Sequence, residues 1–195
     1  SDPQKAIAWF EALDMENDSS FDPLLKDRKM KADDLRNHLM GGLVQGLADT
    51  DPDLAVEFVQ GVLESGNRAA YGMMHAPISA MIKSSSPLEA AQWASQLNEG
   101  PIRDQAIGRA ADHYARKDLE AAKDWAESIS SSDGAERAIG AVTRNWASRD
   151  PEDALDWVSG LPEGKAQHSG TWAALNGWAG KDPSAASDYL ANMPD

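Results

Sequence analysis

The sequence predicts an all-α protein, built as an α-α superhelix (solenoid) of about five helix-turn-helix repeats of about 32 residues plus a terminal helix. The first observation is a recurring phrase, in which a capping Asp or Ser is followed by proline in five of six copies, then by alanine and an aromatic residue. The copies begin 49, 35, 32, 32 and 32 residues apart, at Asp2, Asp51, Ser86, Asp118, Asp150 and Asp182. Such a period is typical of stacked supersecondary units rather than of one wrapped core.

Each copy of the phrase carries the signals that begin a helix. The Asp or Ser side chain is an N-cap acceptor, and proline suits the first helical position because the N–H it lacks has no partner there. Apolar residues then follow at helical spacing, as Ala154, Trp157 and Leu161 do. Glycine- or proline-containing stretches such as 161–164 end these first helices after about three turns.

A second apolar stripe in each repeat predicts a second helix. In residues 118–149 it runs through Ala135, Ile139, Val142 and Trp146, with Arg149 just before the next cap. We therefore expect one helical-repeat domain over residues 1–195, in a chain that is a piece of a longer protein. Its repeats lie near 2–50, 51–85, 86–117, 118–149 and 150–181, with a partial repeat at 182–195.

Two recurring aromatic positions are predicted to pack in the core between helices rather than to form a ligand-binding ladder, because they share a stripe with Ala and Leu. The first holds Trp9, Phe58, Trp93, Trp125, Trp157 and Tyr189, and the second holds Tyr114, Trp146 and Trp178, with Leu47 and Ile82 as apolar substitutes. A third position in the second helix is small, at Gly41, Ala76, Gly108 and Gly140, which indicates close approach by a neighbouring helix. Trp172 breaks that rule, so we expect Trp172 and Trp178 to pack or dimerise differently.

The chain resembles the tetratricopeptide-like helical repeats, in a divergent form of bacterial type. The resemblance is carried by Ala106-Ile107-Gly108, by Ala122 and by the aromatic Trp125, although the period is nearer 32 than 34 and the aromatic follows the alanine by three residues rather than four. It implies a right-handed superhelix whose concave face holds peptides or proteins. It transfers no catalytic residue.

The amino-acid composition narrows the classes of partner that the chain is expected to bind. Eighteen Lys and Arg stand against 32 Asp and Glu, and the formal charge of −14 repels nucleic acid and anionic lipid. No apolar run is long enough to cross a bilayer, so direct membrane insertion is not expected. The chain has no cysteine, which excludes disulfides and thiolate sites but leaves the compartment open; a signal or anchor on a parent chain would favour the periplasm or the cell exterior.

No catalytic, cofactor or metal site is predicted. The four histidines are widely separated, and no nucleophile, base or zinc-binding spacing is present. The long first repeat contains an insertion at 14–34, where Asp14, Glu16 and Asp18 alternate, but Ser19 and Leu25 stand where a calcium loop needs Gly and Glu. We interpret the insertion as a solvated connector with a short extra helix, with a partner-binding loop as the alternative.

The function predicted from these observations is a non-catalytic interaction module that presents a concave acidic surface to proteins or peptides, with basic partners favoured. The alternatives are a structural spacer or scaffold segment of a larger envelope or surface protein and, last, an uncharacterised hydrolase. The oligomeric state stays open. Candidate partner-binding residues outside the core positions are Tyr71, Met73, Met74, Trp172 and Phe21.

Overall fold

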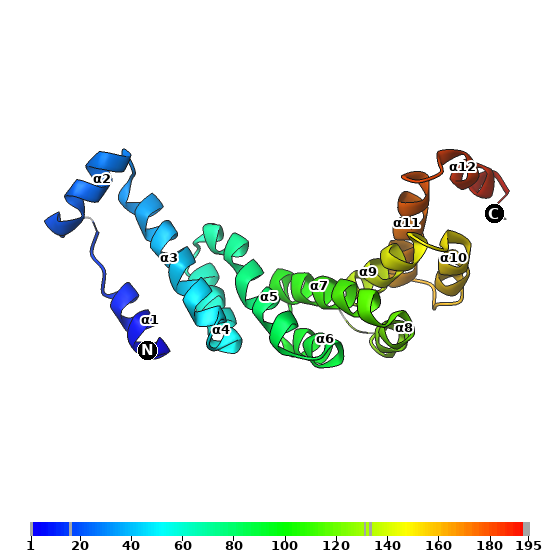
Figure 1. The fold of residues 1–195 in the computed structure, drawn as a ribbon, viewed down its shortest axis with the longest axis horizontal. Helices are drawn as coiled ribbons and strands as arrows, with labels where there is room; N and C mark the ends of the chain where they lie inside the picture. Colours follow the sequence, from blue (N-terminus) through cyan, green and yellow to red (C-terminus); the bar gives the residue numbers. More distant parts are fainter. Residues whose placement is uncertain (1, 16, 131, 133, 193–195) are drawn as a thin grey trace. The chain divides into compact units, whose positions relative to one another are not determined.

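A computed structural model describes residues 2–15, 17–130, 132 and 134–192, and within these residues it is helical, with no strand. The all-α prediction is confirmed, while the count of five solenoid repeats stays a prediction. The twelve α helices and two 3-10 helices are drawn in Figure 1: α1 Pro3–Glu11, η1 Ser19–Phe21, α2 Asp22–Arg28, α3 Ala32–Ala48, α4 Pro52–Glu64, η2 Arg68–Met74, α5 His75–Ser84, α6 Pro87–Gln96, α7 Pro101–Lys117, α8 Leu119–Ser128, α9 Ala135–Ala147, α10 Pro151–Ser159, α11 Lys165–Ala179 and α12 Pro183–Asn192.

The chain divides into two compact units, residues 1–84 (unit 1) and 85–195 (unit 2), and each is described by itself. The division falls next to the predicted boundary between the second and third repeats, residues 85 and 86. Unit 1 contains the elements from α1 to α5, and unit 2 those from α6 to α12.

Unit 1 has its core where α3, α4 and α5 meet. Leu47, Ala48 and Ala55 are buried there, and Ile7 of α1 packs against them. The guanidinium of Arg36 donates to the carbonyl of Leu13 at 3.0 Å and lies 4.8 Å from the ring centre of Phe10, which ties α3 to the end of α1. The insertion forms η1 and α2, so the short extra helix predicted there is present.

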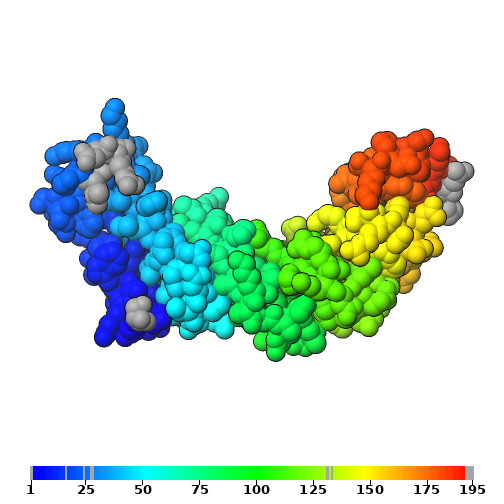
Figure 2. All heavy atoms as spheres, in the orientation of Figure 1, coloured from blue at the N-terminus to red at the C-terminus, as the bar shows by residue number. Residues whose placement is uncertain are grey.

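Unit 2 is arranged in two layers. Helices α7, α9 and α11 pack side by side in one layer, and the shorter α6, α8 and α10 lie along its other side (Figure 1). Figure 2 shows successive helices of this unit, coloured from green to red, in direct contact. The layer of α7, α9 and α11, called the inner layer below, carries the grooves described in the next section.

The predicted helix caps are present in five of the six copies of the phrase. In these copies the cap side chain accepts a hydrogen bond at 3.0–3.3 Å from the backbone N–H of a residue two or three positions later. The five cap residues are Asp2, Asp51, Ser86, Asp118 and Asp182. Asp150 differs, because its side chain makes no capping hydrogen bond although α10 begins directly after it at Pro151. The helix starts therefore follow the local sequence signals even where one bond is absent.

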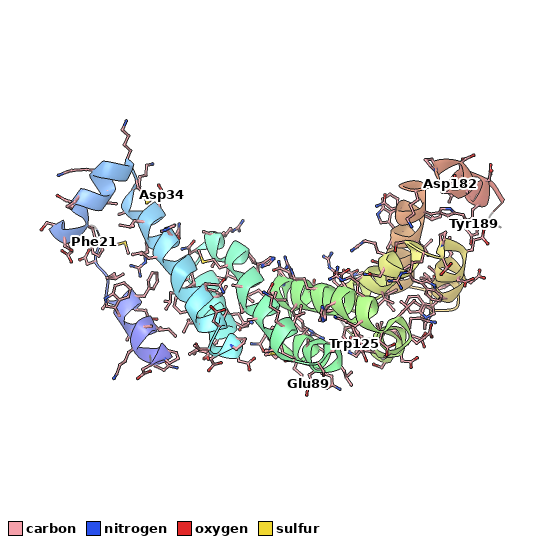
Figure 3. All side chains as sticks on the ribbon, viewed as in Figure 1. Phe21, Asp34, Glu89, Trp125, Asp182 and Tyr189 are labelled. Atoms are coloured by element: carbon pink, nitrogen blue, oxygen red, sulfur yellow. The ribbon has the colours of Figure 1, made fainter. Side chains whose placement is uncertain are left out.

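The two recurring aromatic positions meet each other. Tyr114 pairs with Trp125 at 6.4 Å between ring centres, Trp146 with Trp157 at 5.9 Å, and Trp178 with Tyr189 at 5.3 Å. Figure 3 labels Trp125 on α8 and Tyr189 on α12. Each pair joins an inner-layer helix to the helix that follows it, so the prediction of ring packing between helices holds in unit 2.

Two expectations about the aromatic residues are wrong. Trp9 is 58% exposed, because the adjacent Phe10 takes the buried place on α1 and packs edge-on against Phe58 at 5.9 Å. Trp178 does not pack differently from its equivalents, since it is buried and forms the third ring pair.

Close packing explains the small residue of the second helix at Gly140, but not at Gly108 or Gly41. A Cβ on Gly140 would lie 2.8 Å from Oγ of Ser169 on α11, so the close approach predicted there is present. At Gly108 the nearest atom, Cβ of Arg137, is at an ordinary 3.8 Å, and Gly41 has no neighbour within 4 Å. Trp172 holds the same position in α11 and is 70% exposed.

Gly170 is a second point of close approach between α11 and its neighbours, and it gives a test of the inner layer. A Cβ there would lie 2.8 Å from Cγ2 of Val158 and 3.0 Å from Cγ2 of Ile139. We expect Gly170→Ala to lower the free energy of unfolding by about 1–3 kcal/mol, because overpacking outweighs the better helix propensity of alanine. The measurement is denaturant unfolding followed by circular dichroism.

Gly177 of the same helix is the matched control. Its added Cβ would lie 3.8 Å from Cβ of Ala147, an ordinary contact, so Gly177→Ala should be neutral or stabilising by up to about 1 kcal/mol. Equal effects of the two substitutions would contradict the tight packing at Gly170.

The capping box at the start of α6 predicts a pH dependence. The backbone N–H of Ser86 donates to Glu89 at 2.8 Å, and hydrogen bonds from Ser86 lower the pKa of that carboxyl below its ordinary value. A pKa lowered by folding adds stability above about pH 4.5, which is lost as the pH falls through the folded-state value. The melting temperature of wild type should therefore exceed that of Glu89→Gln at pH 7. The difference between the two melting temperatures should shrink below pH 4.5, as measured by thermal unfolding.

Glu152→Gln in the first turn of α10 serves as the control for general acid effects, because the cap of that helix makes no side-chain hydrogen bond. A gap between wild type and Glu89→Gln that stays constant from pH 7 to pH 3 would contradict the role given to the carboxylate.

Candidate functional site

The candidate partner-binding residues of unit 1 lie mainly on η2. Tyr71 is 45% exposed, Met73 is half-buried, and Met74 is completely buried. The expected exposure of Met74 is therefore wrong, because η2 packs against α3, α4 and α5 and turns that side chain inward. Phe21 is half-buried at the end of η1, where Figure 3 labels it.

Trp172 is the one candidate in unit 2. It is the most exposed of the large apolar side chains of the described residues, and it lies on the free side of α11. The five candidates are thus divided between the two units, and none of them lines the two grooves of unit 2.

Two adjoining grooves mark the inner layer. The first, called the helical groove, has a volume of about 770 Å³ and is lined by α7 from Pro101 to Asp112, by α9 from Glu136 to Arg144, and by Ser169 of α11. The second, called the loop groove, has a volume of about 660 Å³ and lies along the connections before α7, α9 and α11. Pro101, Asp104 and Glu136 line both, so the two grooves form one continuous surface.

Small residues leave the helical groove open. Gly108 of α7, with Gly140 and Ala141 of α9, occupies positions on its lining where a large side chain would fill the space. Longer side chains stand beside them, among them Gln105 and Arg109 on α7 and Arg144 on α9. The close helix packing that requires Gly140 therefore also shapes the groove.

The carboxylates of the helical groove all have cationic partners. Asp112 accepts from Nη2 of Arg116 at 2.7 Å through one oxygen and from the amide of Asn145 at 2.6 Å through the other. Asp104 and Glu136 each lie 4.0 Å from Nε of Arg137, at the outer limit of an ion pair. None of these acids is left without a nearby positive charge.

Two arginines of the same groove have no such partner. Arg109 is half-buried and Arg144 is exposed, and neither makes a hydrogen bond or ion pair with any residue that the structure describes. The three arginines on the lining balance its three carboxylates, so the helical groove is not acidic, in contrast to the expectation from the net charge.

The acidic part of the surface is the loop groove. Glu99 and Glu163 lie on its lining beyond the shared residues, with Lys165 as its one described cation. Gly134 shapes it: its φ of 91° lies in the left-handed region, and an added Cβ would meet Cδ1 of Ile107 at 2.7 Å, so only glycine suits this turn before α9.

The histidine with a shifted pKa lies outside both grooves. Burial, with smaller effects of Lys117 and Arg116, lowers the pKa of His113, which keeps that ring neutral at physiological pH, and His113 lines neither groove. Among the described residues no three His, Asp or Glu side chains come together as a metal site requires. Within the same residues, no helix has the length and apolar character needed to span a bilayer.

Comparison with known proteins gives no family: no family model, curated protein or solved structure matches the chain. The groove arginines were missed by the sequence interpretation, which looked for exposed aromatic and Met residues. A signal was available, because α7 and α9 together carry five arginines and their helical spacing places Arg137 and Arg144 two turns apart on one face.

Trp172 and Trp178 of α11 allow a test of the surface assignment. Trp172→Ala should change the free energy of unfolding by less than about 0.5 kcal/mol, because the ring is exposed. Trp178→Ala should cost about 3–5 kcal/mol, because it empties a buried ring pair. Urea unfolding monitored by circular dichroism measures both, and a large loss at Trp172 would show that the ring is covered in solution.

Proposed function

We propose that this chain is a non-catalytic interaction module, in which stacked helix pairs form a tetratricopeptide-like α-α solenoid that binds a protein or peptide along its inner layer. The solenoid is supported by side-chain contacts between positions one repeat apart. Among the described residues of unit 2, hydrogen bonds join residues 30 or 33 positions apart, close to the 32-residue period, in four cases: Asp112 with Asn145, Glu136 with Ser169, Ser148 with Lys181, and Glu127 with Trp157.

The observation that carries the binding proposal is the continuous surface formed by the helical and loop grooves. Its combined length crosses three helices and their connections, which suits an extended ligand rather than a small substrate. It is lined by charged and polar side chains, including two unpaired arginines, that offer specific contacts to a polypeptide.

The experiment is affinity capture from a lysate of the source organism with three forms of the full chain. Gln105→Trp places a large side chain on the lining of the helical groove, whereas Gln92→Trp places the same side chain on the exposed surface of α6, away from both grooves. Wild type and Gln92→Trp should retain the same proteins in low salt, and Gln105→Trp should lose them.

The captured proteins are identified by mass spectrometry, purified, and titrated against all three forms. A difference of at least tenfold in Kd between Gln105→Trp and Gln92→Trp is expected if the groove is the binding surface. Retention of the same proteins by all three forms, or of none by wild type, would contradict the proposal.

A further inference from the structure

We propose that the helical groove receives a protein segment whose acidic side chains pair with Arg109 and Arg144, and this inference rests on the proposed function. The two arginines lie on the neighbouring helices α7 and α9 and line the same groove. Neither has an anionic partner among the described residues.

The unpaired state of these arginines is informative because the chain is so acidic. With 32 Asp and Glu for 18 Lys and Arg, carboxylates are abundant, yet those of the helical groove lie near other arginines, Asp112 at Arg116 and both Asp104 and Glu136 at Arg137. Asp112, the nearest in sequence to Arg109, has both oxygens occupied, by Arg116 and by Asn145. Within the described part of the chain, Arg109 and Arg144 therefore have no carboxylate partner and can pair with an external one.

The loop groove sets where the acidic side chains can lie. Glu99 and Glu163 would repel a carboxylate placed there, whereas Arg109 and Arg144 attract one at the other end of the surface. The bound segment thus has its acidic residues over the arginines and neutral or basic residues toward the connections. Guanidinium groups bind carboxylates in bidentate geometry, which adds direction to the charge attraction.

Nucleic acid does not meet the same requirements. A polyphosphate would bring negative charge along its whole length, past Glu99 and Glu163 and toward a chain of net charge −14. A protein segment can carry its carboxylates at separate points, over Arg109 and Arg144 alone, and so it meets the requirements of this surface.

The test measures binding of three synthetic twelve-residue peptides by fluorescence anisotropy. One carries four Glu at one end and four Lys at the other, the second replaces the Glu with Gln, and the third alternates the same Glu and Lys along its length. Wild type in low salt should bind the first at least about tenfold more tightly than either of the others, with affinity that falls as salt rises.

Two double variants locate the effect. Arg109→Glu with Arg144→Glu should weaken binding of the first peptide by about tenfold or more, while Arg68→Glu with Arg149→Glu makes the same change in net charge outside both grooves and should leave it nearly unchanged. The groove variant should also gain affinity for an all-Lys peptide, which shows that it is folded.

Equal binding of the Glu and Gln peptides to wild type would overturn the inference, as would equal losses in the two double variants. Tighter binding of a single-stranded oligonucleotide than of the first peptide would overturn it as well, in favour of phosphate. If these peptides fail while Gln105→Trp still loses proteins that Gln92→Trp retains, this inference falls and the proposed function stands.

Discussion

The packing of two rings across each turn is the interaction on which unit 2 depends. In each pair the first ring stands near the end of an inner-layer helix and the second lies on the following helix, as Tyr114 and Trp125 do on either side of the cap Asp118. The cap fixes where the second helix begins, and the ring pair fixes how it lies against the first. Because the same pair recurs at Trp146 with Trp157 and at Trp178 with Tyr189, the inner-layer helices are held in similar relation to their neighbours.

The elements and their starts could be predicted from the sequence because they depend on short-range signals. A capping Asp and a proline act within one helical turn, and the apolar stripe acts within one helix. The burial or exposure of single side chains was harder to predict from the sequence. Trp9 and Phe10 are adjacent, and which of them is buried depends on Phe58, far away in the chain; Met74 is buried because η2 packs on three helices that no local signal indicates.

The charge of the candidate site also depends on contacts between residues that lie far apart in the sequence. The total of −14 describes the chain, and it predicted an acidic binding surface. The charge that a ligand meets depends on which groups neutralise each other, and that is decided by contacts between helices, such as Asn145 of α9 with Asp112 of α7. The carboxylates of the helical groove lie near other arginines, while Arg109 and Arg144 have no partner among the described residues, so the charge balance of the groove differs from that of the whole chain.

The positions that form the fold and those that line the helical groove overlap only in part. The caps, the first-turn prolines and the ring pairs lie within the recurring phrase or close to the turns. In contrast, Gln105, Arg109 and Arg144 lie on the lining of the helical groove. Several residues belong to both. Gly140 admits Ser169 and lines the groove, Pro101 begins α7 and lines it, and Asp112 lines it and accepts from Asn145 of α9. Side chains such as Gln105, Arg109 and Arg144 can therefore differ without any change in the phrase that begins the helices.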